Sequence, residues 1–400
     1  MGKFTRSRAE NDEPLSAGRV EYLEQARQRA RNKRIRRTAV LLVLLTGIVL
    51  FATGLVGSSV AMAKDFIDTA RIALLPGAGW PQQTGVSEVT QVESLTGSFV
   101  ELGKEGCVVY SRSGKKLNSI QSGYARPALA AGRNRFVLYN RSGNELRVES
   151  RTQNLYTKQM ENSIFLCAVA DNGNLAVVTE DISAMAKLLV YNANMEEVLR
   201  WSMSSNDGTP LRMAFSPDSR KLAAAVTASG GQMMTNLYLI NLASGDPVSI
   251  ANQSGVPQWL GWTSASTLLA VYDTRVVLYN AGGGERAAYE FAGNTLKDVS
   301  VDAAGNIALL LGSGQLHQTV LLDKNLNVQF SAAVSAANSI VRAGNLFYLL
   351  ADNAVECFDA SGTQQWSQNL DTSPQALLAN SKDLLLFSGN TVQKLEAPAE

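Results

Sequence analysis

The chain has 400 residues and a formal net charge of +1 at pH 7, with 46% hydrophobic residues. This near-zero total hides an asymmetry, because residues 1–37 carry eleven Lys and Arg against five acidic residues, a net charge of +6. Of the 36 basic and 35 acidic residues in the whole chain, 25 and 30 remain after position 37, a net charge of −5. An acidic remainder does not suit a nucleic-acid-binding surface, so nucleic acid is excluded as a partner of the large domain.

The basic residues of the N-terminal segment lie close to a long apolar stretch. Five of them fall within residues 31–37, directly before that stretch. After it, Lys64 and Arg71 are offset by Asp65 and Asp68. The excess of positive charge on the N-terminal side predicts that residues 1–37 form a cytoplasmic tail. Such a tail is also compatible with binding anionic lipid headgroups, although a role in topology alone accounts for it.

The apolar stretch covers residues 38–63 and contains no charged residue. Its twenty-six residues would form a helix about 39 Å long at ~1.5 Å per residue, which is enough to cross a bilayer core. We therefore predict one uncleaved transmembrane helix over residues 38–63. The alternative is a signal peptide cleaved after Ala61-Met62-Ala63. It is disfavoured because both the apolar region and the basic region before it are longer than those of secretory signals.

Residues 64–85 are expected to form a juxtamembrane segment. Apolar residues near one helical face predict a helix that runs along the outer membrane surface. These residues are Phe66, Ile67, Ala70 and Leu74. Pro76-Gly77 is expected to end that helix. Trp80 suits two interpretations equally well, an anchor in the membrane interface and ordinary packing against the protein.

From residue 86 to residue 397 the sequence repeats a unit of about forty residues, a period typical of propellers. The clearest part of each unit is a β-rich run, a polar turn and a second β-rich run, which is the pattern of a hairpin. Examples begin at Cys107 (CVVYSRSGKKL), Phe136 (FVLYNRSGNEL) and Val276 (VVLYNAGGGER). A second hairpin precedes most of these, as in residues 211–226. Two hairpins per unit make four strands, so the sequence predicts an all-β propeller domain of four-stranded blades at residues 86–397.

The number of blades follows from the outer strands. Seven are expected, near Leu117, Tyr156, Val198, Val248, Ala288, Val328 and Gln365. The C-terminal stretch 374–397 supplies only three further strands. We expect residues 86–92 (VSEVTQV) to provide the missing fourth and close an eight-bladed ring, which leaves few exposed strand edges. A seven-bladed propeller is the alternative, because weak strands near residues 94–102 and 152–160 are ambiguous.

Few residues suit catalysis or metal binding. Cys107, Cys167 and Cys357 each lie in an apolar strand-like run and are interpreted as small buried side chains. The single histidine, His317, excludes a His-rich metal site. Its pairing with a serine such as Ser313 is too unspecific a pattern to predict a catalytic site. We therefore predict no catalytic, cofactor-binding or metal-binding residue, and no cofactor.

Three glycine-containing polar stretches are interpreted as hairpin turns. Residues 171–174 (DNGN) and 302–306 (DAAGN) lack the alternating oxygen ligands and the final Glu of an EF-hand. Residues 281–286 (AGGGER) lack the Gly-Lys-Ser/Thr of a phosphate-binding loop. Trp259 and Trp262 are expected to pack between blades rather than to face a ligand.

Short motifs in the repeats resemble those of known propeller families. SPDSRKLAAAV (216–226) is similar to the strand-turn-strand of WD40-like and TolB-like propellers, and FDASGTQQW (358–366) is similar to the docking motif of pyrroloquinoline-quinone-type (PQQ-like) propellers. Only Trp366 and Trp201 stand at the docking position of the quinone-type pattern. The enzymatic members of that group also need polar and metal-binding residues that converge in the central channel, and no such residues are identified in this sequence.

The whole layout, including the PGAGWP step at residues 76–81, resembles an uncharacterised Firmicutes family of single-span membrane proteins with an extracytoplasmic WD40-like or PQQ-like propeller. This resemblance implies a cell-envelope location and carries no known catalytic residues. We expect a membrane-anchored, non-enzymatic binding or scaffold module that engages a protein or a cell-wall glycan. The alternative is a quinoprotein-type or other propeller-channel enzyme.

Overall fold

The computed structural model describes residues 56–229, 233–313, 316–372, 374–379 and 384–396. The chain divides into two compact units, Met1–Val60 and Ala61–Glu400. The predicted basic tail and most of the predicted membrane span at residues 38–63 lie outside the described residues. Within the described part, no helix is both long and apolar enough to cross a membrane.

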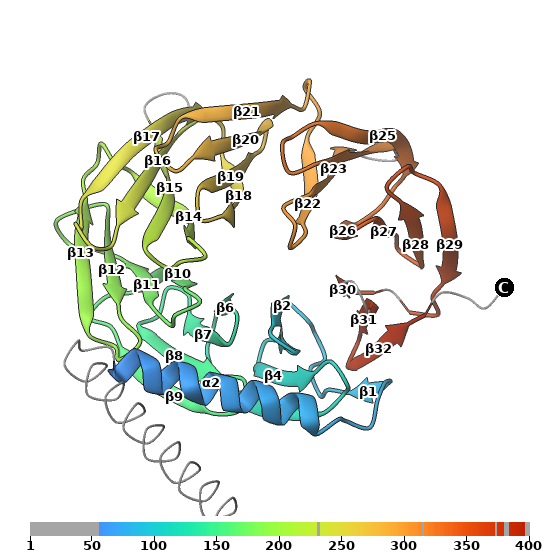
Figure 1. Ribbon diagram of the computed structural model, residues 1–400, viewed down its shortest axis with the longest axis horizontal. Helices are drawn as coiled ribbons and strands as arrows, with labels where there is room; N and C mark the ends of the chain where they lie inside the picture. Colours follow the sequence, from blue (N-terminus) through green and yellow to red (C-terminus); the bar gives the residue numbers. More distant parts are fainter. Residues whose placement is uncertain (1–55, 230–232, 314–315, 373, 380–383, 397–400) are drawn as a thin grey trace, which may run out of the picture. The chain divides into compact units, whose positions relative to one another are not determined.

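The strands of the second unit form, within the described residues, eight four-stranded antiparallel sheets. The inner strands of successive sheets are neighbours around a ring, and the first sheet lies beside the last (Figure 1). We call the sheets blades 1 to 8 in chain order. This arrangement confirms the predicted eight-bladed propeller of four-stranded blades and excludes the seven-bladed alternative.

The strands of the first four blades have the following bounds. Blade 1 contains β2 (Gln91–Leu95), β3 (Ser98–Leu102), β4 (Gly106–Ser111) and β5 (Lys116–Gln121). Blade 2 contains β6 (Pro127–Ala131), β7 (Arg135–Asn140), β8 (Glu145–Ser150) and β9 (Asn154–Gln159). Blade 3 contains β10 (Ile164–Val169), β11 (Leu175–Thr179), β12 (Ala186–Tyr191) and β13 (Glu197–Met203). Blade 4 contains β14 (Thr209–Phe215), β15 (Lys221–Ser229), β16 (Met233–Asn241) and β17 (Pro247–Ser254).

The remaining blades continue in the same order. Blade 5 contains β18 (Pro257–Ser264), β19 (Thr267–Tyr272), β20 (Arg275–Asn280) and β21 (Glu285–Glu290). Blade 6 contains β22 (Leu296–Val301), β23 (Ile307–Ser313), β24 (Leu316–Leu322) and β25 (Val328–Ser335). Blade 7 contains β26 (Ser339–Ala343), β27 (Leu346–Leu350), β28 (Ala354–Asp359) and β29 (Gln364–Asn369). Blade 8 contains β30 (Ala376–Ala379), β31 (Leu384–Ser388), β32 (Thr391–Leu395) and β1 (Gln82–Gln83).

The hydrophobic core lies between blades. Its clusters join Val137 of blade 2 to Val177 of blade 3, and Leu269 of blade 5 to Leu309 of blade 6. Because both faces of each blade are covered by neighbours, the middle strands are mostly apolar, and every residue of β3 and β11 is buried, including Glu101 of β3. The outer strands β25 and β29 instead alternate between exposed and half-buried residues, because one face meets water.

The ring is closed by an N-terminal strand, but not by the one we predicted. Gln82 of β1 pairs with Val392 and Gln83 pairs with Thr391 on the outer edge of blade 8. The prediction that residues 86–92 form this strand was wrong. After β1 the chain is at the outer edge of blade 8, whereas β2, the first strand of blade 1, lies at the inner edge of the ring. Most of residues 86–92 connects these two edges, and Gln91 already belongs to β2.

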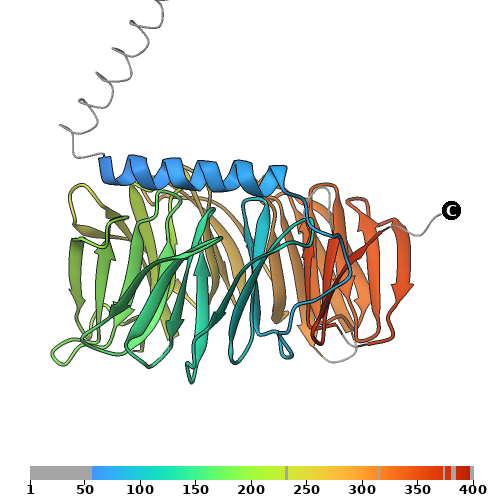
Figure 2. The same cartoon turned by 90° about the horizontal axis from the view of Figure 1, so that it is seen from below.

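Helix α2 (Val56–Leu74) ends directly before Pro76-Gly77, as the sequence predicts. From Asp65 onward it lies across one face of the ring, where Asp65 contacts Arg135 and Arg151 of blade 2 and Ile72 lies beside Gly97 of blade 1 (Figure 2). Residues 64–85, which the sequence predicts to be a juxtamembrane segment, therefore belong to the folded second unit.

Candidate functional site

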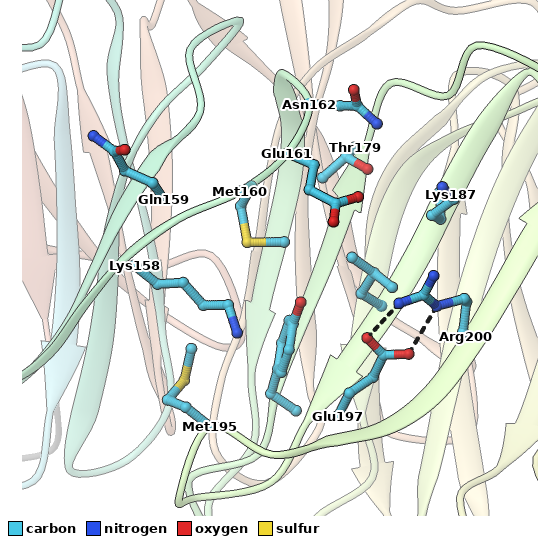
Figure 3. A pocket seen from close by; sticks show the side chains of 12 residues that line it. Lys158, Gln159, Met160, Glu161, Asn162, Thr179, Lys187, Met195, Glu197 and Arg200 are labelled. Carbon is cyan, nitrogen blue, oxygen red and sulfur yellow. Dashed lines mark hydrogen bonds and ion pairs between the residues drawn. The ribbon is translucent and has the colours of Figure 1, made fainter.

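A pocket of about 270 Å³ lies between blades 2 and 3 (Figure 3). The outer strand β9 of blade 2 and the connection that follows it form one wall, and strands β11, β12 and β13 of blade 3 form the other. We call it the interblade pocket. Its lining consists of Lys158, Gln159, Met160, Glu161, Asn162, Thr179, Lys187, Leu189, Tyr191, Met195, Glu197 and Arg200.

Charged side chains of both signs are held in fixed positions in this pocket. Arg200 donates two hydrogen bonds of 2.8 Å, from Nε and Nη2, to the two carboxylate oxygens of Glu197 (Figure 3). The Nζ of Lys158 lies 4.1 Å from the ring centroid of Tyr191, a cation–π contact. Such a set of preoriented charges beside two methionines is suited to recognising a ligand with charged and apolar groups.

Glu197 and Tyr191 keep their ordinary charge states in this pocket. The hydrogen bond from Arg200 lowers the pKa of Glu197, and burial raises the pKa of Tyr191. Both shifts move the pKa further from 7, so at pH 7 the Glu197 carboxyl group is ionised and the Tyr191 hydroxyl group is protonated. A general acid or base works best with a pKa near the working pH. The described lining residues include no Ser, Cys or His.

Two larger hollows lie elsewhere on the propeller. One, of about 430 Å³, lies beside the connection between β1 and β2 and includes Thr84 and Gly103. The other, of about 410 Å³, is between blades 5 and 6 and includes Arg286 and Lys324. The first is lined by the Lys104–Glu88 ion pair, but the described lining of neither hollow includes an aromatic ring.

The candidate residues weighed from the sequence lie outside the interblade pocket. Cys107, Cys167 and Cys357 are free and buried, as interpreted from the sequence. His317 is 2% exposed, its Nδ1 accepts a hydrogen bond of 3.0 Å from the amide of Ala337, and burial lowers its pKa. Within the described residues, no three His, Cys, Asp or Glu side chains are grouped so that they could hold a metal ion.

The polar glycine-containing stretches are hairpin turns, as interpreted from the sequence. The Oδ1 of Asp302 accepts hydrogen bonds from the amides of Ala304 (2.8 Å) and Asn306 (2.9 Å). The same pattern of amides two and four residues later recurs at Asn192, Asn280, Asp323 and Asp359. At residues 171–174, the Oδ1 of Asn172 accepts from the amide of Asn174 at 2.9 Å. These side-chain oxygens are used to close the turns.

The tryptophans pack within and between blades. Trp262 of blade 5 donates its Nε1–H to the carbonyl oxygen of Ala214 in blade 4 at 3.1 Å, and Trp259 joins the cluster between blades 5 and 6. Trp201 packs edge-on against Tyr238 of blade 4, with ring centroids 4.9 Å apart. Trp366 packs in the cluster between blades 7 and 8. The predicted packing role of Trp259 and Trp262 is therefore confirmed.

The PGAGWP step docks on the β4–β5 turn of blade 1. The amide of Gly77 donates to Ser113 Oγ at 2.8 Å, and the amide of Gly79 donates to the Ser113 carbonyl at 3.0 Å. A Cβ atom at Gly77 would overlap main-chain atoms of Gly114 and Lys115, so only glycine fits there. Trp80 donates its Nε1–H to the carbonyl of Arg112 at 2.9 Å and packs on aromatic rings of blade 1. Trp80 therefore has the ordinary packing role.

Comparison with known proteins identifies a family and a fold. A family model described as a family of unknown function, DUF5711, matches residues 80–396. No curated protein sequence matches the chain. The propeller is similar to a solved eukaryotic initiation factor, with 12% identity, a TM-score of 0.53, and coverage of 78% of this chain and 83% of the other.

Two bacterial structures are similar to the same extent. BamB from Moraxella catarrhalis has 13% identity and a TM-score of 0.52, with 80% of this chain and 99% of that chain covered. Apo AztD from Citrobacter koseri has 11% identity and a TM-score of 0.53, with 72% and 87% covered. At these identities the similarity shows the propeller fold alone.

Proposed function

This chain belongs to the family of unknown function DUF5711, and we propose that it is a membrane-anchored extracytoplasmic propeller that acts as a non-enzymatic binding or scaffold module in the cell envelope. The observation that carries this proposal is the interblade pocket. Glu197 and Arg200 in it form a bidentate ion pair, and its described lining contains no Ser, Cys or His. Fixed charges of this kind serve recognition rather than bond cleavage.

The chemistry of the pocket favours a protein partner over a glycan. Sugar rings are commonly recognised by stacking on an open aromatic face, but the only aromatic ring lining the described pocket, Tyr191, is buried and carries the Lys158 ammonium over it. Met195, which is half-buried, offers an adaptable apolar contact, and Lys158 and Glu197 offer opposite charges. A peptide segment with acidic, basic and apolar side chains matches this set.

The membrane anchor in the proposal rests on the sequence. Residues 38–63 contain no charge, and five basic residues precede them within residues 31–37. A tag at residue 2 should be protected from protease added to intact wall-stripped cells, while the propeller is cleaved or released. Cleavage of the N-terminal tag with survival of a C-terminal one would reverse the proposed topology.

Photo-crosslinking in intact cells tests the binding role. A photoreactive residue at Gln159, exposed at the pocket, should capture a protease-sensitive partner, whereas the same residue at Gln364, exposed on the outer strand of blade 7, should not. Arg200→Ala should abolish capture at Gln159. Equal capture at both positions, or no effect of Arg200→Ala, would contradict the role of the pocket. Captured material that resists protease but yields to a muramidase would identify a glycan instead.

The enzyme alternative has a separate test. The purified protein is titrated with pyrroloquinoline quinone and calcium while its ultraviolet-visible spectrum is recorded. A chromophore that stays with the protein after desalting and is reduced by substrate would support the quinoprotein alternative. The expected result is that desalting removes all of the quinone absorbance.

A further inference from the structure

The polar side of α2 is turned toward the propeller. Asp65 is buried, and its Oδ2 accepts a hydrogen bond of 3.1 Å from Arg135 Nε in an ion pair that is almost fully shielded from solvent. Arg151 donates to the Asp65 carbonyl at 2.7 Å and to Thr69 Oγ1 at 2.8 Å. Thr152 Oγ1 donates to Asp68 at 2.9 Å. The hydrophilic residues of the helix thus hold it against blade 2, and Arg151 also donates to the carbonyl of Thr96 in blade 1.

The apolar side of α2 is turned away from the propeller. Phe66 is 75% exposed, Ile67 63% and Leu74 78%. At about 100° per residue these three side chains project from the side of the helix opposite Asp65 and Ile72, which are both buried. Ala70 and Ala73, also exposed, lie among them. A helix on the surface of a water-soluble protein usually turns its apolar side inward, whereas the apolar residues Phe66, Ile67 and Leu74 of α2 face outward.

A contiguous exposed apolar face indicates a contact surface for a partner, another copy of the chain or a membrane. Here the sequence next to the face favours lipid. The uncharged stretch 38–63 ends three residues before Phe66, and α2 is one uninterrupted helix from Val56 through that junction. Arg71, exposed at the edge of the apolar side, is suited to lipid phosphate.

We propose that the outward face of α2, formed by Phe66, Ile67 and Leu74, lies in the headgroup region of the bilayer and turns the α2-bearing face of the propeller toward the membrane. This inference rests on the proposed membrane anchor and adds the orientation of the domain. The residues that hold α2 to the propeller are distinct from those lining the interblade pocket.

The full-length protein in lipid nanodiscs provides the test. The native cysteines are buried, so a single introduced cysteine can be labelled with an environment-sensitive fluorophore. The test positions are Phe66→Cys, Ile67→Cys and Leu74→Cys. The control is Ile182→Cys, which is 98% exposed in the β11–β12 connection. This connection is at the opposite end of β11 from the β10–β11 turn, where Gly173 lies beside the Arg135 side chain that pairs with Asp65 of α2. A second control, Leu50→Cys, lies within the predicted span.

Nitroxide lipids labelled near the headgroup should quench the fluorophore at positions 66, 67 and 74 at least several-fold more strongly than at position 182. Quenching at 66, 67 and 74 no greater than at 182, with strong quenching at position 50 by nitroxides deep in the acyl chains, would overturn the orientation and leave the anchor intact. Absence of quenching at position 50 would overturn the anchor and the orientation together. A blue-shifted emission at 66, 67 and 74 without lipid quenching would show a protein cover and also overturn the inference.

Discussion

The Nη2–H of Arg151, in the turn after β8, donates a hydrogen bond of 2.7 Å to the main-chain carbonyl of Asp65 in α2, 86 positions earlier in the chain. The same guanidinium also reaches Thr69 Oγ1 and the carbonyl of Thr96 at 2.9 Å. Arg151 has no solvent exposure, and burial lowers the pKa of its guanidinium. One buried cation therefore joins the helix to both blades beneath it.

Replacing Arg151 with methionine should release α2. Arg151→Met removes three hydrogen bonds from a buried charged donor, so we expect a loss of about 2–4 kcal/mol in the free energy of unfolding and faster protease cleavage within α2. Arg133→Met is the matched control, because the Arg133 side chain is 76% exposed in its ion pair with Asp171 and should cost at most about 1 kcal/mol. Urea unfolding in detergent measures both, and equal losses would contradict the anchoring role.

Gly77→Ala should undock the PGAGWP step. The added methyl group would overlap main-chain atoms of Gly114 and Lys115, which cannot move without distorting the β4–β5 turn. We expect a loss of about 2–3 kcal/mol, typical of overpacking at a close backbone contact. Gly282→Ala, in an exposed turn where the added atom meets only the Asn280 side chain, is the control and should cost less than about 1 kcal/mol. A smaller loss for Gly77→Ala than for Gly282→Ala would show that the docked contact is not tight.

The closing strand β1 is held in place by the residue that follows it. The amide of Thr84 donates to the carbonyl of Asn390 at 2.9 Å. Thr84→Pro removes this donor and should free β1, which exposes the edge of β32 to pairing between molecules. Thr84→Val keeps the amide and should remain monomeric. Light scattering over a concentration series distinguishes the two variants, and a monomeric Thr84→Pro protein would show that β1 is not needed to protect the edge.

The blades were predictable because their signals are local. An Asp or Asn that closes several of the turns, such as Asp302 or Asn280, and an apolar run on either side recur along the chain and identify the hairpins. The closing strand was not predictable, because Gln82 and Gln83 have no strand preference of their own. Their pairing is imposed by distant contacts, those of Trp80 with blade 1 and of Thr84 with blade 8.

The interblade pocket was equally hidden in the sequence. Lys158 and Arg200 belong to different blades, and only the stacking of blade 2 on blade 3 brings them to one site. No fixed spacing marks such a set. For α2, the sequence predicted the apolar face but not its direction. The apolar positions 66, 67 and 74 were predicted to share a face, but only the buried partners of Asp65 show that this face points away from the protein.

Two turn-closing residues should differ in their contribution to stability. Asn280 caps an exposed turn through two amides, and Asn280→Ala should cost about 1 kcal/mol. Asp302 closes its turn in the same way but also faces the buried guanidinium of Arg342, with 4.0 Å between Oδ2 and Nε. Asp302→Ala should therefore cost about 2–4 kcal/mol, because it also removes the counter-charge of a buried cation. Equal losses in urea unfolding would show that the Asp302–Arg342 pair adds no stability.

Glu101 places a buried carboxyl group at the ring closure. The residue is 1% exposed, and its Oε1 accepts a hydrogen bond of 3.3 Å from Thr84 Oγ1. Its Oε2 is buried without a hydrogen-bond partner among the described residues. Burial raises the pKa of Glu101 from 4.5 to about 7, opposed only in part by the bond from Thr84.

The raised pKa of Glu101 makes the stability of the propeller depend on pH. Between pH 4.5 and about 7 the folded protein keeps a proton that the unfolded chain releases, so the free energy of unfolding should fall as pH rises through this window. The stabilisation is complete below the lower pH and lost above the upper one, and the loss should be at most a few kcal/mol, on the order of 1.4 kcal/mol for each pH unit that the window spans. The amide of Glu101→Gln stays uncharged at every pH, so the variant should lack this dependence. Its free energy of unfolding should fall less between pH 5 and pH 8 than that of the wild type. Urea unfolding of both proteins at these two pH values measures the difference, and parallel pH profiles would show that Glu101 is ionised in the folded state without cost.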